Sequence, residues 1–293
     1  MTFAGPAGDI VLVFAPHPDD EAIGCAGVIQ RTLAAGGKVR VVSFTNGDGF
    51  PAAAAGLVHK PIDQLTADDF FAISRFRQMQ MRNALKILGG QVDDLILLGY
   101  PDSGLADLYN QTTGKPLLQP FTKKTGTYAL IQKDYHTLRY GQAAPYTHAA
   151  VLADVIELIK SIQPAEIYVT SGADAHKDHR AASWFVRDAV KSAAYKGAFY
   201  TYLVHGLPHH AWPWPEGITP TLPFAAHQVE GVAAPQGLPW PPPRRDPLSP
   251  EQAATKLKAL RAHEIHPVGN PDHQKNMESF VKCEEVFWLG GGK

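Results

Sequence analysis

Cysteine is scarce in this sequence, which has only Cys25 and Cys283 among its 293 residues. The two lie far apart along the chain and form no C-x-x-C pair. We therefore expect neither a disulfide framework nor a structural zinc site built on cysteines. Long apolar runs are also missing, since no stretch approaches the roughly 18 residues of a membrane span, and we expect no such span.

An excess of charge of one sign is absent as well. The chain has 27 lysines and arginines against 28 aspartates and glutamates, a formal net charge of −1. A near-neutral chain has no general attraction for nucleic acid or acidic membranes, so we expect neither as a partner. The first residues, MTFAGPAGDI, contain no basic segment before an apolar one. The sequence thus predicts a cytoplasmic protein without a signal peptide.

What the sequence does contain is an alternation of strand and helix patterns. Short apolar runs predict strands at 10–15, 38–45, 94–99, 165–171 and 198–206. Apolar residues at helical spacing predict helices at 20–35, 66–88, 148–162, from 180 onward and at 250–263. This alternation is typical of a parallel sheet with right-handed crossovers. We therefore predict a single α/β domain over residues 1–293, with helices on both faces of a mainly parallel sheet.

Two regions interrupt the alternation. Residues 106–146 are polar and weakly periodic, which predicts an insertion or a long loop. Residues 208–250 hold 12 of the 24 prolines, together with Trp212, Trp214 and Trp240. Because proline disfavours helices and central strands, an ordered surface loop or a pair of edge strands is expected there. The alternative is a wall of proline and tryptophan beside a ligand cleft.

Polar groups follow four of the predicted strands. They occur in HPDDE (17–21), NGDG (46–49), YPDSG (100–104) and GADAHKDHR (172–180). In open parallel sheets, ligands bind outside the carboxyl ends of the strands. The four stretches therefore predict one site assembled from four loops.

A metal site is the simplest interpretation of the ionisable groups in these loops. His17, Asp20 and His179 supply two nitrogens and one oxygen and leave a fourth position open, as a catalytic zinc ion requires. Iron and cobalt fit the same ligand set. Asp19, next to a proposed ligand, can accept a proton from metal-activated water as general base.

Three further side chains fit around this site. His176 is positioned to donate a proton or a hydrogen bond to a developing oxyanion. Glu21 is expected to hydrogen-bond a ligand histidine from behind the metal. Asp48 in the NGDG stretch is either functional or part of an ordinary turn.

These motifs resemble a known family, the PIG-L / LmbE-like zinc-dependent de-N-acetylases. The resemblance rests on APHPDDEAIGCAG (15–27), HKDHRAA (176–182), RQMQMRNALKILG (77–89), LGYPDSGL (98–105) and KLKALRAH (256–263). It implies a Rossmann-like fold. It also implies zinc ligation by His17, Asp20 and His179, with Asp19 as general base. His176 would stabilise the oxyanion or protonate the leaving amine.

The resemblance further implies sugar contacts by Arg77 and Asp102, with Asp48 lining the same pocket. Three positions depart from the family pattern. Gln80 replaces a glutamate, Lys177 replaces a proline, and Asp174 stands where some relatives have a tyrosine. The last departure argues against a mechanism assisted by that tyrosine, but none removes a proposed metal ligand.

The predicted function is a zinc-dependent hydrolase that removes an N-acetyl or short N-acyl group from an amino sugar such as N-acetylglucosamine, or from a glycoconjugate. The alternative is a non-catalytic carbohydrate-binding relative, although a pure binder has no need of Asp19. A dinucleotide-dependent oxidoreductase is disfavoured because PHPDDEAIG replaces the required G-x-G-x-x-G. A homo-oligomer is allowed, since relatives vary in oligomeric state, but no stretch of the sequence marks an interface.

Overall fold

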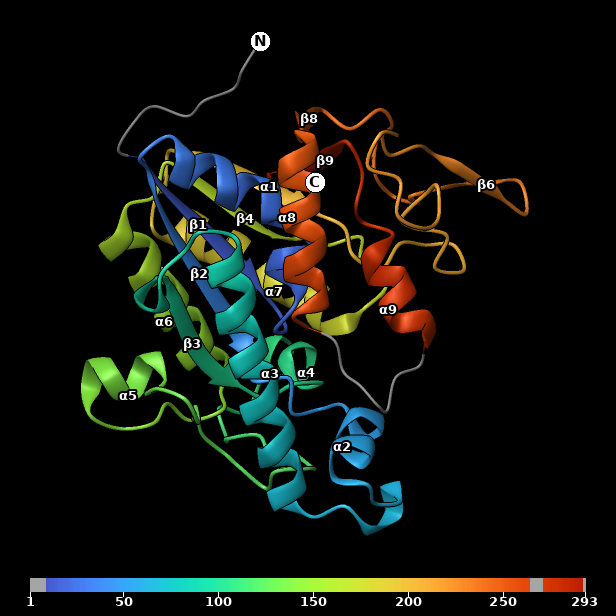
Figure 1. The fold of residues 1–293 in the computed structure, drawn as a ribbon. Helices are drawn as coiled ribbons and strands as arrows, with labels where there is room; N and C mark the ends of the chain where they lie inside the picture. The colour runs from blue at the N-terminus through green and yellow to red at the C-terminus, as the bar shows by residue number, and fades with distance from the viewer. Residues whose placement is uncertain (1–8, 264–270, 292–293) are drawn as a thin grey trace.

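The computed structural model describes residues 9–263 and 271–291 (Figure 1). Its centre is a seven-stranded sheet in the order β3-β2-β1-β4-β5-β9-β8. The five parallel strands are β1 (Ile10–Ala15), β2 (Lys38–Thr45), β3 (Leu95–Tyr100), β4 (Glu166–Thr170) and β5 (Ala198–Tyr202). The antiparallel edge consists of β9 (Glu284–Leu289) and β8 (Arg244–Pro247), and a separate hairpin pairs β6 (His227–Val229) with β7 (Val232–Ala234).

Helices cover both faces of this sheet, because its central strands are apolar on both sides. The helices are α1 (Asp20–Ala34), α2 (Pro51–Val58), α3 (Ala67–Ile87), α4 (Leu105–Tyr109), α5 (Tyr135–Tyr140), α6 (His148–Ile162), α7 (Lys177–Ser192), α8 (Pro250–Arg261) and α9 (Pro271–Glu278). Two short 3₁₀ turns, Ile62–Gln64 and Val92–Asp94, complete the elements. None of the helices in the described ranges is both long and apolar enough to span a membrane.

The alternation of side chains along β1 separates two hydrophobic cores. Val11 and Val13 pack with residues of α1, α3 and α8 on one face. Leu12 and Phe14 pack with residues of α4, α6 and α7 on the other face. All four side chains are buried, as expected for the central strand of a parallel sheet. The predicted fold class, a mainly parallel α/β sheet with helices on both faces, is thereby confirmed.

The parallel part of the sheet agrees closely with the predicted elements. Strands 10–15 and 38–45 and the helix at 148–162 have the predicted bounds. Ser249 caps α8 with Pro250 as its first residue, and Thr66 begins α3 in a capping box. The sequence patterns did not predict β9, whose residues EEVFWL begin with two acids. Residues 208–250 hold the β6–β7 hairpin and the edge strand β8, and 106–146 hold only the short α4 and α5 between irregular stretches.

The strand order determines where a site can form. β1 and β4 are neighbours, but the chain leaves β1 toward β2 on one side and β4 toward β5 on the other. Such a reversal opens a crevice at the carboxyl ends of the two strands. The stretch HPDDE follows β1 and the stretch GADAHKDHR follows β4, so the fold brings both to this crevice.

Candidate active site

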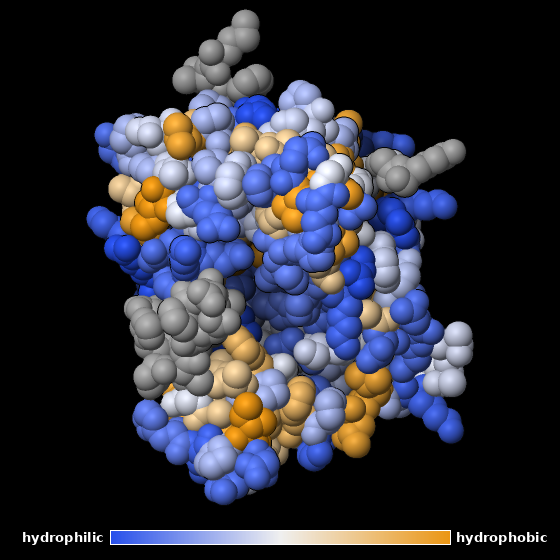
Figure 2. Space-filling model, turned by 90° about the vertical axis from the view of Figure 1, so that its right-hand side faces the viewer, coloured by the Kyte–Doolittle hydropathy of each residue, from blue (hydrophilic) through white to orange (hydrophobic). Residues whose placement is uncertain are grey.

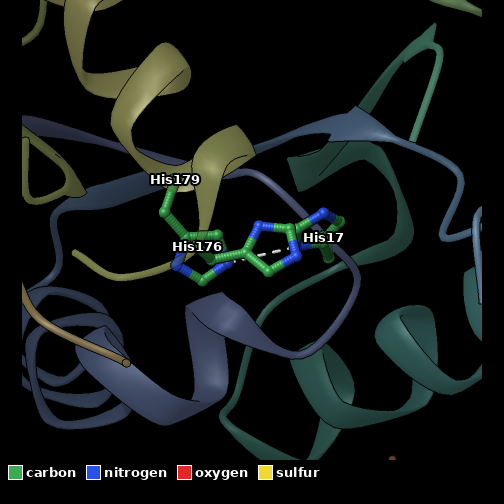
Figure 3. Close-up of side chains that lie close together, drawn as sticks. All are labelled: His17, His176 and His179. Carbon is green, nitrogen blue, oxygen red and sulfur yellow. Dashed lines mark hydrogen bonds between the residues drawn. The ribbon is translucent and has the colours of Figure 1, made fainter. Parts of the chain in front are cut away.

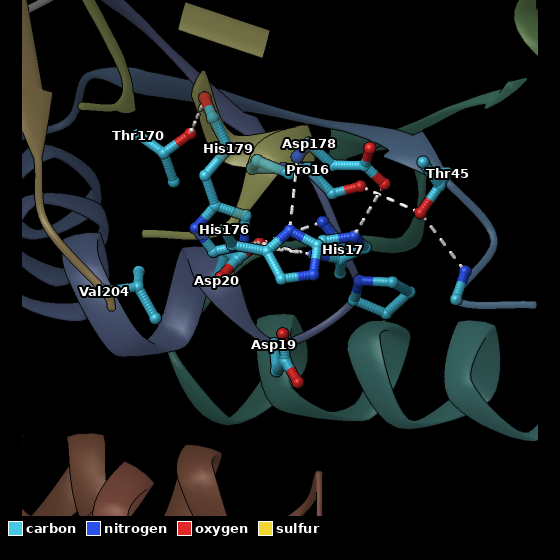
Figure 4. Close-up of polar contacts among 12 residues, drawn as sticks. Pro16, His17, Asp19, Asp20, Thr45, Thr170, His176, Asp178, His179 and Val204 are labelled. Atoms are coloured by element: carbon cyan, nitrogen blue, oxygen red, sulfur yellow. Dashed lines mark hydrogen bonds and ion pairs between the residues drawn. The ribbon is translucent and has the colours of Figure 1, made fainter. Parts of the chain in front are cut away.

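The three predicted metal ligands converge at the crevice. His17 lies on the loop after β1, Asp20 begins α1, and His179 lies in the first turn of α7. Nδ1 of His17 is 3.1 Å from Nε2 of His179 (Figure 3). Oδ2 of Asp20 is 3.5 Å from the first of these nitrogens and 3.3 Å from the second (Figure 4). Three donor atoms thus form a nearly equilateral triangle between buried side chains.

The outer nitrogen of each of these histidines faces a carboxylate. Nε2 of His17 is 3.2 Å from Oδ1 of Asp102 and 3.4 Å from Oδ2 of Asp178. Nδ1 of His179 is 3.2 Å from Oδ2 of Asp174. Carboxylates in this position fix the ring orientation and tautomer of metal-binding histidines. The arrangement leaves His17 Nδ1 and His179 Nε2 turned toward the same point as Asp20.

Backbone amides hold two of these carboxylates in place. Asp178 accepts hydrogen bonds from the N–H groups of Ser103 and Leu105, at 2.6 and 3.1 Å. Asp174 accepts from the N–H groups of His176, Val204 and His205, at 2.8, 3.0 and 3.0 Å. Burial raises the pKa of Asp174, but the charge of His179 and hydrogen bonds to the carboxylate outweigh this and lower it below its usual value. Asp174 therefore supports His179 in this chain.

The electrostatics of the cluster are those of closely packed opposite charges. Burial lowers the pKa of His17, but the charge of Asp102 and hydrogen bonds to Asp102, Asp178 and Asp20 outweigh it, so this pKa is well above its usual value. Burial raises the pKa of Asp20, but the charges of His179 and His17 hold it well below its usual range. Buried carboxylates outnumber the two imidazoles, so the cluster has negative charge that a divalent cation can balance.

Two other triplets of possible ligand atoms occur among the described residues. His17, His176 and His179 form one, and His17, Asp102 and Asp178 form the other, with atoms within 4.8 Å of one another. Nδ1 of His176 accepts the Asp178 N–H at 3.2 Å, so this nitrogen is already occupied. Asp102 and Asp178 face the outer nitrogen of His17. Asp20 contacts both ligand histidines, since its Oδ2 lies 3.5 Å from Nδ1 of His17 and 3.3 Å from Nε2 of His179.

Asp19 lies beside this triangle in a strained backbone conformation. Its φ of 140° is rare for a residue with a side chain, and such strain is often found at functional sites. Nη2 of Arg77, from the middle of α3, donates to Oδ2 of Asp19 and to the carbonyl of Pro18, each at 3.0 Å. The absence of a side chain at Gly47 leaves room for the Arg77 guanidinium, because a Cβ there would lie 2.5 Å from it. Arg77 is thus a positioning group for Asp19 as well as part of the cavity wall.

Glu21 and Asp48 lie behind the site. One oxygen of Glu21 accepts the Asp19 N–H at 3.1 Å and the other is 2.9 Å from Nε2 of His263. These partners differ from the ligand histidine that the sequence predicted. Asp48 is fully buried and accepts from the Tyr128 hydroxyl at 2.7 Å and from the Asp102 N–H at 3.2 Å. Burial and the nearby charge of Asp102 raise the pKa of Asp48 to about 7. The structure places Asp48 behind the cavity wall, whereas the family resemblance had placed it on the wall.

A cavity of about 570 Å³ opens above the triangle. Its walls include the predicted residues His17, Asp19, Asp20, Arg77, Asp102, His176 and His179. Figure 2 shows a hollow with a hydrophilic floor on the face of the molecule bordered by α2 and α9. A larger cavity, of about 660 Å³, lies at the opposite edge of the sheet and contains none of these side chains.

Sequence reasoning missed two histidines of the cavity, His205 and His210. His205 follows β5, and its ring lies 5.0 Å from that of His179 between centroids. Burial and the charge of His179 lower the pKa of His205 to about 4. The sequence could have indicated His205 through its position directly after a predicted strand. β5 is parallel to β4 and ends at the same edge of the sheet.

Comparison with known proteins identifies the family. The sequence pattern of the GlcNAc-PI de-N-acetylase (PIG-L) family matches residues 12–190, more than half of the chain. The chain belongs to the PIG-L family. The matched range contains all three residues of the triangle together with Asp19 and His176, so the family pattern covers the centre of the site. A search of curated proteins found no significant match.

Several solved structures share the fold of this PIG-L member. The A40926 pseudoaglycone deacetylase has a TM-score of 0.56 and 16% identity, with 96% of each chain covered. The N,N'-diacetylchitobiose deacetylase from Pyrococcus horikoshii has a TM-score of 0.53 and 16% identity. The match covers 96% of this chain and 83% of the Pyrococcus chain. The 4-carboxy-2-hydroxymuconate hydratase from Pseudomonas putida KT2440 has a TM-score of 0.53 and 14% identity. The match covers 93% of this chain and 84% of the hydratase chain. These likenesses concern the fold alone, which accommodates both deacetylases and a hydratase.

Proposed function

We propose that this PIG-L member is a zinc-dependent hydrolase that removes an N-acetyl or similarly short N-acyl group from an amino sugar or its conjugate. Family membership and deacetylases among the structural neighbours, such as the two described above, support the reaction class. The observation that carries the proposal is the triangle of His17 Nδ1, Asp20 Oδ2 and His179 Nε2, with spacings of 3.1 to 3.5 Å.

The donor set fits zinc in type and spacing. Zinc binds histidine nitrogens and carboxylate oxygens at about 2.0 to 2.2 Å, so neighbouring donors of a tetrahedral site lie about 3.3 to 3.6 Å apart. The outer histidine nitrogens face carboxylates, as in most protein metal sites. His17, Asp20 and His179 would hold the ion and leave one position open. When bound, zinc supplies a Lewis acid and brings the pKa of a bound water to about 7.

Asp19 is the proposed general base. It lines the cavity next to Asp20, and Arg77 fixes its carboxylate by a hydrogen bond of 3.0 Å to Oδ2. A carboxylate held in this way accepts a proton from the water that attacks the amide carbonyl. Asp19 then passes this proton to the nitrogen as the carbon–nitrogen bond breaks. The products are a free amine and a carboxylate. The oxygen of the added water becomes part of the carboxylate, and one of its protons is transferred to the amine.

His176 is the proposed donor to the developing oxyanion. It caps α7, and its Nδ1 accepts the Asp178 N–H. A neutral ring that accepts at Nδ1 carries its hydrogen on Nε2. That N–H group donates to the carbonyl oxygen as negative charge develops there. In this proposal, His176 acts as a hydrogen-bond donor and Asp19 supplies the proton for the amine.

The test is zinc-dependent release of acetate from N-acetylglucosamine and N,N'-diacetylchitobiose. The protein is stripped with a chelator and reloaded with measured amounts of zinc, and acetate is quantified. Asp19→Ala is expected to lower kcat by about 10² to 10⁴-fold while the zinc content stays at the wild-type value. His17→Ala is expected to lose both zinc and activity. Asp68→Asn, an exposed acid on α3, is the matched control.

Two results would contradict the proposal. Zinc content that falls together with activity in Asp19→Ala would make Asp19 a ligand and not the base. Binding of either sugar by the zinc-loaded wild type without any acetate release would favour a carbohydrate-binding protein over an enzyme.

A further inference from the structure

A second cavity adjoins the one above the triangle. Its volume is about 390 Å³, and His210 and Asn276 line both cavities. Ligand pockets commonly measure about 300 to 1,000 Å³, so each of the two spaces has the size of a binding site. Because they share two wall residues, a molecule held in the first cavity can extend into the second.

The walls of this second cavity come from parts of the chain outside the family match. They are built by the stretch after β5, by the β6 strand and by α9, all beyond residue 190. Figure 1 shows α9 beside the loops that carry β6. β5 ends at the same edge of the sheet as β1 and β4, which explains why these walls continue the active-site cavity. This region is therefore the part of the protein that can adapt a common reaction to a particular substrate.

One wall of the second cavity is an aromatic face. Trp214 is half-buried and stacks on His227, with ring centroids 3.7 Å apart and an interplanar angle of 11°. Trp212 differs, since it is buried against Phe224 and its indole N–H donates to the carbonyl of Leu203. Trp212 is thus a core residue, whereas Trp214 stacks on His227 and lines the cavity.

Polar groups line the remaining walls. The Lys275 ammonium and the Glu216 carboxylate lie 4.0 Å apart and are both well exposed. Asn276 and Ser279 from the C-terminal side add an amide and a hydroxyl group. A pyranose ring has an apolar face of C–H groups and a rim of hydroxyls, so it matches an aromatic plate with donors and acceptors around it. An acyl chain could not form hydrogen bonds with these polar groups.

We propose that the second cavity is a subsite for a second pyranose ring, linked to the ring whose N-acyl group is removed. The inference rests on the proposed function and specifies its substrate class as oligosaccharides or glycosides with at least two rings. Trp214 would stack on this second ring, and Lys275, Glu216 and Asn276 would bond its hydroxyls.

The experiment compares one-ring and two-ring substrates. kcat/KM is measured for N-acetylglucosamine and N,N'-diacetylchitobiose, and the dissociation constants of both sugars are measured by calorimetry. The wild type is expected to favour the two-ring sugar by at least about tenfold, the effect of 1.4 kcal/mol. Trp214→Ala is expected to abolish this ratio, and Trp214→Phe to retain most of it. Leu222→Ala, an exposed apolar residue of the same segment, is the control.

The outcomes separate the two proposals. Acetate release with the same ratio in wild type and Trp214→Ala would overturn the subsite and leave the proposed function intact. An absence of acetate release from both sugars would overturn the proposed function. In that case, the ratio of dissociation constants still decides whether Trp214 binds a second ring. The circular dichroism spectrum of Trp214→Ala checks folding, and Trp214→Phe provides the comparison if that variant unfolds.

Discussion

Replacement of Asp174 by asparagine tests how the site holds His179. Oδ2 of Asp174 accepts from the Val204 and His205 amides and faces His179 Nδ1, while Oδ1 accepts from the His176 N–H at 2.8 Å. Asparagine has the same shape but only one acceptor oxygen. With that oxygen in the Oδ2 position, the new NH₂ group faces the His176 N–H, donor against donor.

Two effects of Asp174→Asn follow from this geometry. The partly buried His176 N–H loses its partner, which is expected to lower the free energy of unfolding by about 1 to 3 kcal/mol. The ring of His179 also loses its carboxylate. Loss of such a partner typically weakens metal binding by about 10 to 100-fold, or about 1.4 to 2.7 kcal/mol. Zinc affinity is therefore expected to fall in addition to stability.

The assay is competition for zinc with a chromophoric chelator, together with urea unfolding of the metal-free protein. Asp107→Asn, which changes an exposed acid on α4, is the matched control. If Asp174→Asn keeps a zinc dissociation constant within about twofold of the wild type while its stability falls, Asp174 shapes the loops but does not position His179, and the reasoning fails.

The remaining predictions concern the metal, a buried ion pair and a buried acid. Protein in free zinc at 100 times the dissociation constant is expected to lose about 2.7 kcal/mol of its free energy of unfolding when the zinc is removed, seen as a lower Tm. Lys256→Met leaves the Glu285 carboxylate, 2.9 Å from Lys256 Nζ, without its buried partner, which is expected to cost about 3 to 5 kcal/mol in urea unfolding. Asp48 has an ordinary pKa of 3.8, raised to about 7 in the folded protein, so between these values the folded state binds more protons than the unfolded state. The free energy of unfolding should therefore fall as pH rises from about 4 to 7, and Asp48→Asn should remove that part of the fall.

Each of these has a result that would contradict it. A Tm that is the same with and without chelator would mean that no metal balances the charges of the cluster. Lys258→Met, on an exposed position of α8, is the control for Lys256→Met, and an equal effect of both would refute the ion-pair argument. A wild type and an Asp48→Asn variant with parallel stability profiles over pH 4 to 7 would show that Asp48 ionises normally.

Local patterns were sufficient for the central elements of the fold. The strands at 10–15 and 38–45 are continuous apolar runs because both of their faces are covered, so they stand out in the sequence. β8 carries no such run, and the apolar part of β9 is only the four residues VFWL. β8 reads RRDP, and β9 begins with Glu284 and Glu285, whose charges are compensated by Arg245 and Lys256 from other parts of the chain. A strand of this kind is recognisable only when its partners are known.

The same distinction applies to the site. The residue types in HPDDE and HKDH indicated a metal site, because imidazole and carboxylate groups at strand ends have few other uses in that combination. The partners of those residues were beyond sequence reasoning. Asp174 and Asp178 are ordinary acids in the sequence, and their roles toward His179 and His17 depend on where loops from different strands meet.

The sequence by itself determined the alternating α/β pattern and the chemical groups of the candidate centre, since both depend on residue type and short spacing. Only the tertiary structure decided which atoms face one another. His17 and His179 are 162 positions apart, and they meet because β1 and β4 are neighbours at the point where the strand order reverses. The same packing placed Asp48 behind the cavity wall, and it brought the segment of Trp214 to the edge of the sheet where the cavity opens.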